Sequence, residues 1–77
     1  MPMAAYVLYS TVGCHLCEQA QQLCSEVLGQ AVPEVDISTD DALLERYGIR
    51  IPVLQRLDTG AELGWPFDAD AIMQFLE

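Results

Sequence analysis

The chain has 77 residues and is 52% hydrophobic, which predicts one small domain over residues 1–77 with a packed core. Its net charge of −9, from twelve acidic residues against three arginines and no lysine, excludes nucleic acid as a partner, because phosphate binding needs clustered Lys and Arg. No apolar run reaches the roughly 18 residues that span a membrane, and the N-terminus lacks the basic segment of a signal peptide, so we expect a cytoplasmic protein. The charge favours solubility, and its functional interpretation is steering toward a basic protein partner.

A strand and a turn are the first predicted elements. Residues 4–9 form a continuous apolar, β-favouring run, which indicates a strand buried on both faces in the middle of a sheet. The turn covers residues 10–13, where Thr11 or Gly13 would cap the helix that follows. Gly13 also allows the backbone to bend tightly just before Cys14.

A helix is predicted over residues 14–28, and Gly29 is placed to end it. Its apolar positions follow the i, i+3, i+4, i+7 spacing of a helix that packs one face against a core: Leu16, Cys17, Ala20, Leu23, Cys24, Val27 and Leu28. Cys24 lies two turns after Cys17, about 10 Å along a helix. Since a disulfide tolerates only about 7 Å between Cα atoms, we expect Cys24 in the core and not in a redox pair.

An edge strand and a short helix come next. Residues 32–37 alternate polar and apolar side chains, as a half-exposed strand does. Pro33 places this strand at a sheet edge or at a strand start, because proline cannot donate to a ladder. Ser38, followed three residues later by Asp41, forms a weak capping box for a helix over residues 40–47.

A hairpin and a last helix complete the chain. Residues 49–57 predict a strand that is interrupted at Pro52, and a turn at residues 58–60 joins it to a short strand over residues 61–65. Asp68 would cap the last helix, whose core-facing side chains are predicted to be Ala69, Ile72, Met73 and Leu76.

These elements define an α/β fold in the order strand, helix, strand, helix, strand, strand, helix. The first strand–helix–strand unit should be parallel and right-handed, and the hairpin then adds two antiparallel strands. The expected result is a mixed four-stranded sheet flanked by three helices that cover both of its faces.

Cys14 and Cys17 are the candidate catalytic residues. Two cysteines with two residues between them, at a strand-to-helix junction, are typical of a redox pair. A helix N-terminus offers unpaired N–H groups and a partial positive charge, which stabilise the reactive thiolate. We therefore expect Cys14 to attack a partner disulfide and Cys17 to resolve the mixed disulfide. His15 either stabilises the Cys14 thiolate as an imidazolium or is an exposed residue with a mild effect on the potential.

Two segments carry a family resemblance, namely Cys14-His15-Leu16-Cys17 and Tyr47-Gly48-Ile49-Arg50-Ile51-Pro52-Val53-Leu54. Through them nearly the whole chain resembles a glutaredoxin-like member of the thioredoxin superfamily, specifically the short bacterial glutaredoxin-like proteins. The resemblance implies a minimal thioredoxin-like fold. It also implies that Pro52 follows a cis peptide bond beside the cysteines, and that Ile51 presents backbone groups to a bound peptide or to glutathione.

Two departures from this family pattern concern glutathione. Thr11 stands where glutathione-using glutaredoxins carry a Lys or Arg that holds a carboxylate. Asp68 matches the family's aspartate at the entry to the last helix, but the glycine pair that accompanies it is absent. Glutathione and this chain are both anionic, which disfavours glutathione as the reductant. We expect no required cofactor. Glutathione and a reductase remain alternative reductants.

We therefore predict a monomeric thiol–disulfide oxidoreductase acting on a disulfide-containing protein or a small-molecule disulfide. Two alternatives stay open: a non-catalytic thioredoxin-fold module that docks a basic partner, and a carrier of an iron–sulfur cluster bridged between two copies through Cys14. Trp65 and Phe67 are expected to pack the last helix, or to form an apolar lip beside Cys14. The side chains that could be counted toward a zinc site are Cys14, His15, Cys17 and Cys24. One helix cannot direct all four at one ion, so we predict no metal site.

Overall fold

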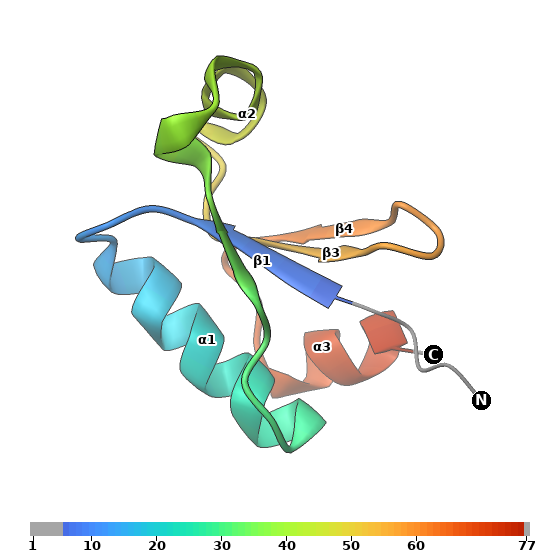
Figure 1. Ribbon diagram of the computed structural model, residues 1–77. Helices are drawn as coiled ribbons and strands as arrows, with labels where there is room; N and C mark the ends of the chain where they lie inside the picture. The colour runs from blue at the N-terminus through green and yellow to red at the C-terminus, as the bar shows by residue number, and fades with distance from the viewer. Residues whose placement is uncertain (1–5, 77) are drawn as a thin grey trace.

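A four-stranded mixed sheet forms the centre of the molecule. The structure is a computed structural model that describes residues 6–76, so positions 4 and 5 of the predicted first strand lie outside the described residues. The strands lie in the spatial order β2-β1-β3-β4, with bounds β1 Tyr6–Ser10, β2 Glu34–Asp36, β3 Val53–Arg56 and β4 Glu62–Gly64. β1 and β2 are parallel, whereas β3 is antiparallel to both β1 and β4, which confirms the predicted α/β fold (Figure 1).

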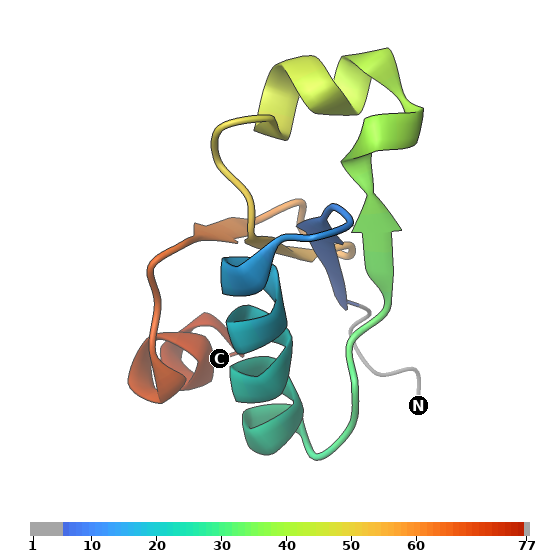
Figure 2. The same ribbon diagram turned by 90° about the vertical axis from the view of Figure 1, so that its left-hand side faces the viewer.

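Helices cover both faces of the sheet, as predicted. α1 (His15–Leu28) and α3 (Ala69–Leu76) lie on one face, while a short 3₁₀ helix, η1 (Ile37–Thr39), and α2 (Asp41–Tyr47) lie on the other (Figures 1 and 2). The larger apolar core lies between the sheet and α1 and α3, and its buried members are Leu8, Ala20, Cys24, Val32, Leu54, Phe67 and Ile72. A smaller core on the α2 side is formed by Ile37, Tyr47 and Val53.

Cys14 is the residue that caps α1, so the predicted cap at Thr11 or Gly13 is wrong. The Cys14 backbone is extended, and its Sγ accepts a hydrogen bond from the N–H of Cys17. Gly13 instead provides the tight bend, with a φ of +76° that L side chains rarely adopt. Gly29 ends α1 in the left-handed conformation, as its position predicted.

Two aspartates, and not Ser38, cap the short helices between β2 and β3. The Asp36 carboxylate accepts hydrogen bonds from the N–H and the hydroxyl of Ser38 and so caps η1. Asp40 caps α2 by accepting from the N–H groups of Ala42 and Leu43. The predicted capping box at Ser38 is therefore wrong, because η1 intervenes before α2 begins.

The strand predicted over residues 49–57 starts only at Val53. The N–H groups of Arg50 and Ile51 both donate to the carbonyl of Tyr47, at 2.8 Å and 3.1 Å, so these residues continue the turn that ends α2. The Ile51–Pro52 peptide bond is cis, as the family resemblance implied. The bond before Pro66 is also cis, which the sequence did not predict.

Two predicted core residues instead lie at the surface. Leu16 is 45% exposed, because α1 turns its first apolar side chain away from the sheet. Met73 is 49% exposed, and α3 packs through Ile72 with the partly buried Ala71 and Phe75. The exposure of Leu16, two positions from Cys14, matters for the surface described below.

Candidate active site

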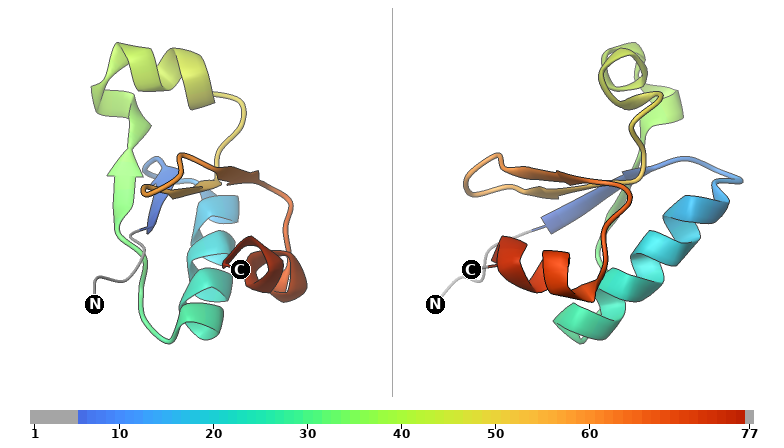
Figure 3. Two further views of the ribbon diagram at one scale, coloured as in Figure 1. Left: turned by 90° about the vertical axis from the view of Figure 1, so that its right-hand side faces the viewer. Right: turned by 180° about the vertical axis from the view of Figure 1, so that it is seen from behind.

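One edge of the sheet brings the predicted site residues together. The register pairs Ser10 with Asp36 and Tyr9 with Val53, so β1 and β2 end at the edge where β3 begins. The turn that carries Cys14 leaves β1 at this edge. The start of α1, the loop into β3 and the segment after β4 consequently lie at the same end of the molecule, opposite the β3–β4 turn (Figure 3).

Cys14 and Cys17 form a disulfide at this edge, with their Cα atoms 5.2 Å apart. Cys17 lies in the first turn of α1 and is only 3% exposed, whereas Cys14 is half-buried. The N–H of Cys17 donates to the Sγ of Cys14 at 3.1 Å. Cys14 is therefore the more accessible sulfur of the pair, and its position at a helix N-terminus is one that favours a thiolate when the disulfide is reduced.

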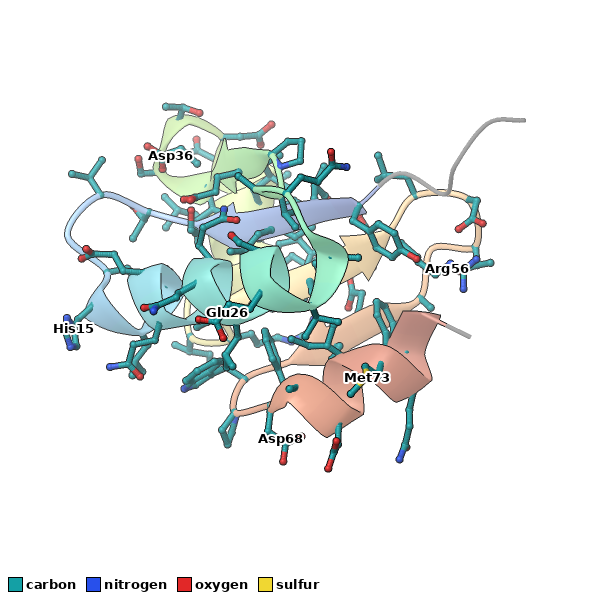
Figure 4. All side chains as sticks on the ribbon, turned by 90° about the horizontal axis from the view of Figure 1, so that it is seen from below. His15, Glu26, Asp36, Arg56, Asp68 and Met73 are labelled. Atoms are coloured by element: carbon teal, nitrogen blue, oxygen red, sulfur yellow. A yellow bond between two sulfur atoms is a disulfide. The ribbon has the colours of Figure 1, made fainter. Side chains whose placement is uncertain are left out.

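His15 and Thr11 flank the pair, and the Thr11 carbonyl accepts a hydrogen bond from the N–H of Cys14 at 3.4 Å. His15 is the first residue of α1, is exposed and projects outward at one end of the molecule (Figure 4). Thr11 is half-buried in the turn after β1. Its hydroxyl interacts with the Asp36 carboxylate, an interaction that helps to lower the pKa of Asp36. Thr11 thus lies beside the Asp36 carboxylate, at the position where the resemblance to glutathione-using glutaredoxins would imply a Lys or Arg.

Pro52 is buried at the start of β3, and its carbonyl accepts a hydrogen bond from the N–H of Trp65 at 3.1 Å. Ile51 is half-buried. Its N–H already donates to the Tyr47 carbonyl, so a bound peptide would have to replace that bond or use the other backbone groups of this loop. The expected role of Ile51 in peptide binding stays a prediction.

Asp68 caps α3, as predicted, because its carboxylate accepts from the N–H of Ala71 at 2.8 Å. Together with Pro66, Phe67 and Ala71 it lines an open hollow of about 370 Å³. Phe67 is 8% exposed and belongs to the core, which confirms the packing interpretation for this ring. Trp65 packs edge-on against Phe67 at a ring separation of 5.0 Å but remains partly exposed.

A second hollow, of about 180 Å³, adjoins the turn before Cys14. Its lining residues are Ser10, Thr11, Val12, Glu34 and Asp36. Hydrogen bonds from the Ser38 N–H and hydroxyl lower the pKa of Asp36, so this carboxylate is charged at neutral pH. The sequence analysis did not single out the two acidic residues here. The parallel pairing of β1 and β2 was the available signal, since it brings Asp36 to the edge where Ser10 ends.

A charged cluster, also not predicted, fastens α2 to the hairpin. The Tyr47 hydroxyl and the Arg50 guanidinium both donate to the Glu62 carboxylate, at 2.5 Å and 2.9 Å, and Arg46 lies 3.9 Å from it. The hydrogen bond from Tyr47 and then the contacts with Arg50 lower the pKa of Glu62. Burial and the Glu62 carboxylate raise the pKa of Tyr47 to about 12. Because Tyr47 also holds the N–H of Ile51, this cluster fixes the loop that leads to Pro52.

Cys24 is a buried free thiol in the main core, as predicted, and burial raises its pKa to about 11. Among residues 6–76, no three His, Cys, Asp or Glu side chains converge where they could hold a metal ion. In that same part of the chain, every helix is too short or too polar to cross a membrane.

The fold and the helix-capping cysteine pair define a glutaredoxin-like protein with a thioredoxin fold. Residues 6–77 match the family described as "Glutaredoxin-like domain (DUF836)", and the chain belongs to this family. No curated protein matches the chain.

Solved structures of bacterial proteins are similar to this chain over nearly its whole length. The X-ray structure of target protein XcR50 from X. campestris is 42% identical, with a TM-score of 0.85, 94% of this chain covered and 95% of that one. Its solution structure gives a TM-score of 0.82 with 94% and 91% covered. Protein Ne2328 from Nitrosomonas europaea is 26% identical, with a TM-score of 0.77 and coverage of 100% and 95%.

Proposed function

We propose that this protein is a thiol–disulfide oxidoreductase in which Cys14 is the nucleophile and Cys17 the resolving thiol. The observation that carries the proposal is the hydrogen bond from the Cys17 N–H to the Cys14 Sγ within a closed disulfide. One cysteine is accessible at a helix end that favours its thiolate, and the other is buried within bonding distance. Membership of the glutaredoxin-like family supports the same chemistry.

The reaction proceeds in two exchanges. The Cys14 thiolate attacks one sulfur of a substrate disulfide, so that a Cys14–substrate disulfide forms and the substrate S–S bond breaks. The released substrate thiolate takes up a proton from water. Cys17 then loses its proton to water and attacks the Cys14 sulfur, which releases the second substrate thiolate. The substrate gains two electrons and the cysteine pair loses two, and an external thiol or dithiol reductant restores the pair.

The reductant follows from the charge around the site. Glutathione would place its carboxylates near Thr11, where Glu34 and Asp36 line the adjoining hollow. Repulsion between these carboxylates and those of glutathione weakens binding, so we propose a dithiol reductant, such as a reductase, in preference to glutathione. No bound cofactor takes part in the proposed exchange. Because a single chain supplies both cysteines, we propose that the protein acts as a monomer. We propose a reducing compartment such as the cytoplasm as its place of action.

The reduction potential tests this function directly. Protein would be equilibrated with thiol–disulfide buffers of defined potential, trapped by alkylation, and its free thiols counted by mass. We expect a reversible two-electron transition between about −120 and −270 mV, the range of working oxidoreductases. Cys17→Ser should abolish the transition, and Cys24→Ala should preserve it, because Cys24 is buried in the core.

Two results would overturn the proposal. If Cys14 and Cys17 form no intramolecular disulfide in any buffer, the exchange mechanism fails, and a binding module that docks a basic partner becomes the better explanation. If reduced protein forms the pair but reduces neither bis(2-hydroxyethyl) disulfide nor a peptide disulfide in a Cys14-dependent manner, the pair is not a catalyst.

A further inference from the structure

The surface around Cys14 points to one class of substrate, and this inference rests on the proposed thiol–disulfide exchange. We infer that Cys14 acts on protein disulfides bordered by an apolar side chain and by Lys or Arg, and not on free small-molecule disulfides of negative charge. The occupant of this surface is thus a folded partner or a peptide segment with a basic rim. Three features carry the inference: exposed apolar residues beside Cys14, carboxylates on both sides of it, and the placement of the arginines.

Exposed apolar side chains flank the nucleophile on both sides in the sequence. Val12 is 86% exposed and Leu16 is 45% exposed, each two residues from Cys14. Trp65 is partly exposed at the same sheet edge, where its backbone N–H donates to the Pro52 carbonyl. We call Val12, Leu16 and Trp65 the apolar rim. When a partner side chain excludes water from these residues, the free energy of the complex is lowered. A small polar disulfide cannot cover them in this way.

Carboxylates lie on both sides of the apolar rim. Glu34 and Asp36 line the hollow that begins at Ser10, and Asp36 is charged because its pKa is lowered. Asp68 lines the other hollow, at the start of α3. Figure 4 shows Asp36 and Asp68 on opposite sides of α1, with His15 at the tip between them. A partner that brings its disulfide to Cys14 therefore passes between two acidic regions.

The arginines do not neutralise this edge. Arg50 and Arg46 pair with Glu62 on the α2 side, at 2.9 Å and 3.9 Å. Arg56 pairs with Asp58 at 3.0 Å, and it lies at the end of the molecule away from His15 (Figure 4). The field at Cys14 is therefore set by carboxylates, and it attracts cations and repels anions over about a Debye length.

The exchange with such a partner balances as it does for any disulfide. The Cys14–partner bond forms as the partner S–S bond breaks, Cys17 then closes the Cys14–Cys17 disulfide, and the partner leaves with two thiols after taking up two protons. Surface charge alters how fast the partner arrives and how tightly it docks, and it leaves this chemistry unchanged.

Three matched peptides test the inference. Each carries one intramolecular disulfide with a neighbouring leucine, flanked by lysines, serines or glutamates. Reduced protein is mixed with each peptide, and the appearance of peptide thiols is followed by mass at two salt concentrations. At about 0.01 M salt we expect the lysine peptide to react at least about tenfold faster than the glutamate peptide. At about 1 M salt the two rates should converge to within about twofold, because the Debye length falls to about 3 Å.

Charge-matched variants locate the effect. Glu34→Gln, Asp36→Asn and Asp68→Asn, combined in one protein, should reduce the lysine-to-glutamate rate ratio to about twofold or less. Asparagine keeps the Oδ1 acceptor that the Asp36 and Asp68 caps use, and glutamine at position 34 keeps one of the two oxygens that accept from Ser10 and Gln21. The control combines Glu26→Gln, Asp41→Asn and Glu45→Gln, which remove the same charge from exposed helix positions away from the rim. This control should keep the full ratio. Circular dichroism establishes that both proteins are folded.

A second pair of variants tests the apolar rim. Val12→Ser combined with Leu16→Gln should slow reduction of the lysine peptide by about fivefold, the effect of losing an interface side chain. Met73→Gln, which removes an equally exposed apolar side chain from α3, should leave that rate unchanged.

The outcomes separate the two proposals. Equal rates for the three peptides at low salt, or a lysine-to-glutamate ratio that the combined Glu34, Asp36 and Asp68 variant does not change, overturn this inference while disulfide exchange stands. A preference for the glutamate peptide overturns it as well. If no peptide and no neutral disulfide is reduced through Cys14, the proposed function fails, and this inference fails with it.

Discussion

The backbone N–H of Cys17 points at the sulfur of Cys14 across 3.1 Å, so the helix that holds the second cysteine also solvates the first. This hydrogen bond is available whether Cys14 is a disulfide sulfur or a thiolate. Hydrogen bonding to a charged form favours that form, and the helix N-terminus adds a partial positive charge.

We therefore expect the Cys14 thiol of the reduced protein to have a pKa below about 8.5, the value of a free cysteine. The measurement is the rate of alkylation by iodoacetamide as a function of pH, in Cys17→Ser protein so that no disulfide re-forms. The rate should reach half its maximum below about pH 8.5. A midpoint at or above this value means that the acidic surface outweighs the helix end.

Cys24 should not react in the native protein. It is fully buried, and burial raises its pKa to about 11, so very little thiolate is present at neutral pH. Reduced native protein treated with iodoacetamide should be alkylated at Cys14 and not at Cys24, whereas unfolded protein should gain three adducts by mass. An adduct at Cys24 that forms on native protein as fast as the one at Cys14 contradicts the structure.

Gly13 should be the glycine least tolerant of a side chain near the cysteine pair. Its φ of +76° is costly for L-alanine, although open space surrounds its Cα. Gly13→Ala is expected to lower the free energy of unfolding by about 1–2 kcal/mol in denaturant titration. Gly64→Ala is the control, because Gly64 also has open space but no positive φ, and it should cost less than Gly13→Ala.

Acid should weaken the contact between α2 and the hairpin through Glu62. Its pKa is lowered in the folded protein, first by the hydrogen bond from Tyr47 and then by Arg50. A lowered folded pKa contributes stability that is present above the unfolded pKa, about 4.3, and is lost as the pH falls through the folded pKa. In Glu62→Gln protein the free energy of unfolding should therefore fall less steeply below about pH 4 than in the parent.

The control for this prediction is Glu45→Gln, which removes an exposed carboxylate from α2, the helix that Glu62 holds to the hairpin. It should keep the acid dependence of the parent. Some dependence also remains in Glu62→Gln, since the pKa values of Asp36 and Asp58 are lowered too. An identical acid profile in Glu62→Gln and the parent contradicts the assigned role of this cluster.

Much of the fold could be predicted because local sequence signals and tertiary packing agree. The helical spacing from Cys17 to Cys24 describes a face that is buried in the structure. Gly29 and Asp68 end and begin helices through their own backbone or side-chain chemistry, which needs no distant partner. The prediction that the strand begins before Pro52 was wrong because local sequence preference and tertiary contacts disagree there. Its apolar residues favour a strand, but the Tyr47 carbonyl takes the N–H groups of Arg50 and Ile51.

In the candidate site, too, local features could be predicted from the sequence, whereas features set by strand pairing could not. The spacing of Cys14 and Cys17 after a strand was enough to predict a redox pair, and the disulfide distance agrees with it. Glu34 and Asp36 could not be placed beside the Thr11 turn from spacing alone, because they follow it by more than twenty residues. Only the parallel pairing of β1 and β2 brings them there.

The sequence by itself determined the order of the elements, the cysteine pair at a helix start and the strong negative charge, because each depends on residues near one another in the chain. The tertiary structure decided that Leu16 faces outward. It also decided that the carboxylates gather at the Cys14 edge while the arginines pair elsewhere. These features depend on strand register and on which helix face meets the sheet, and both are set by contacts between residues far apart in sequence.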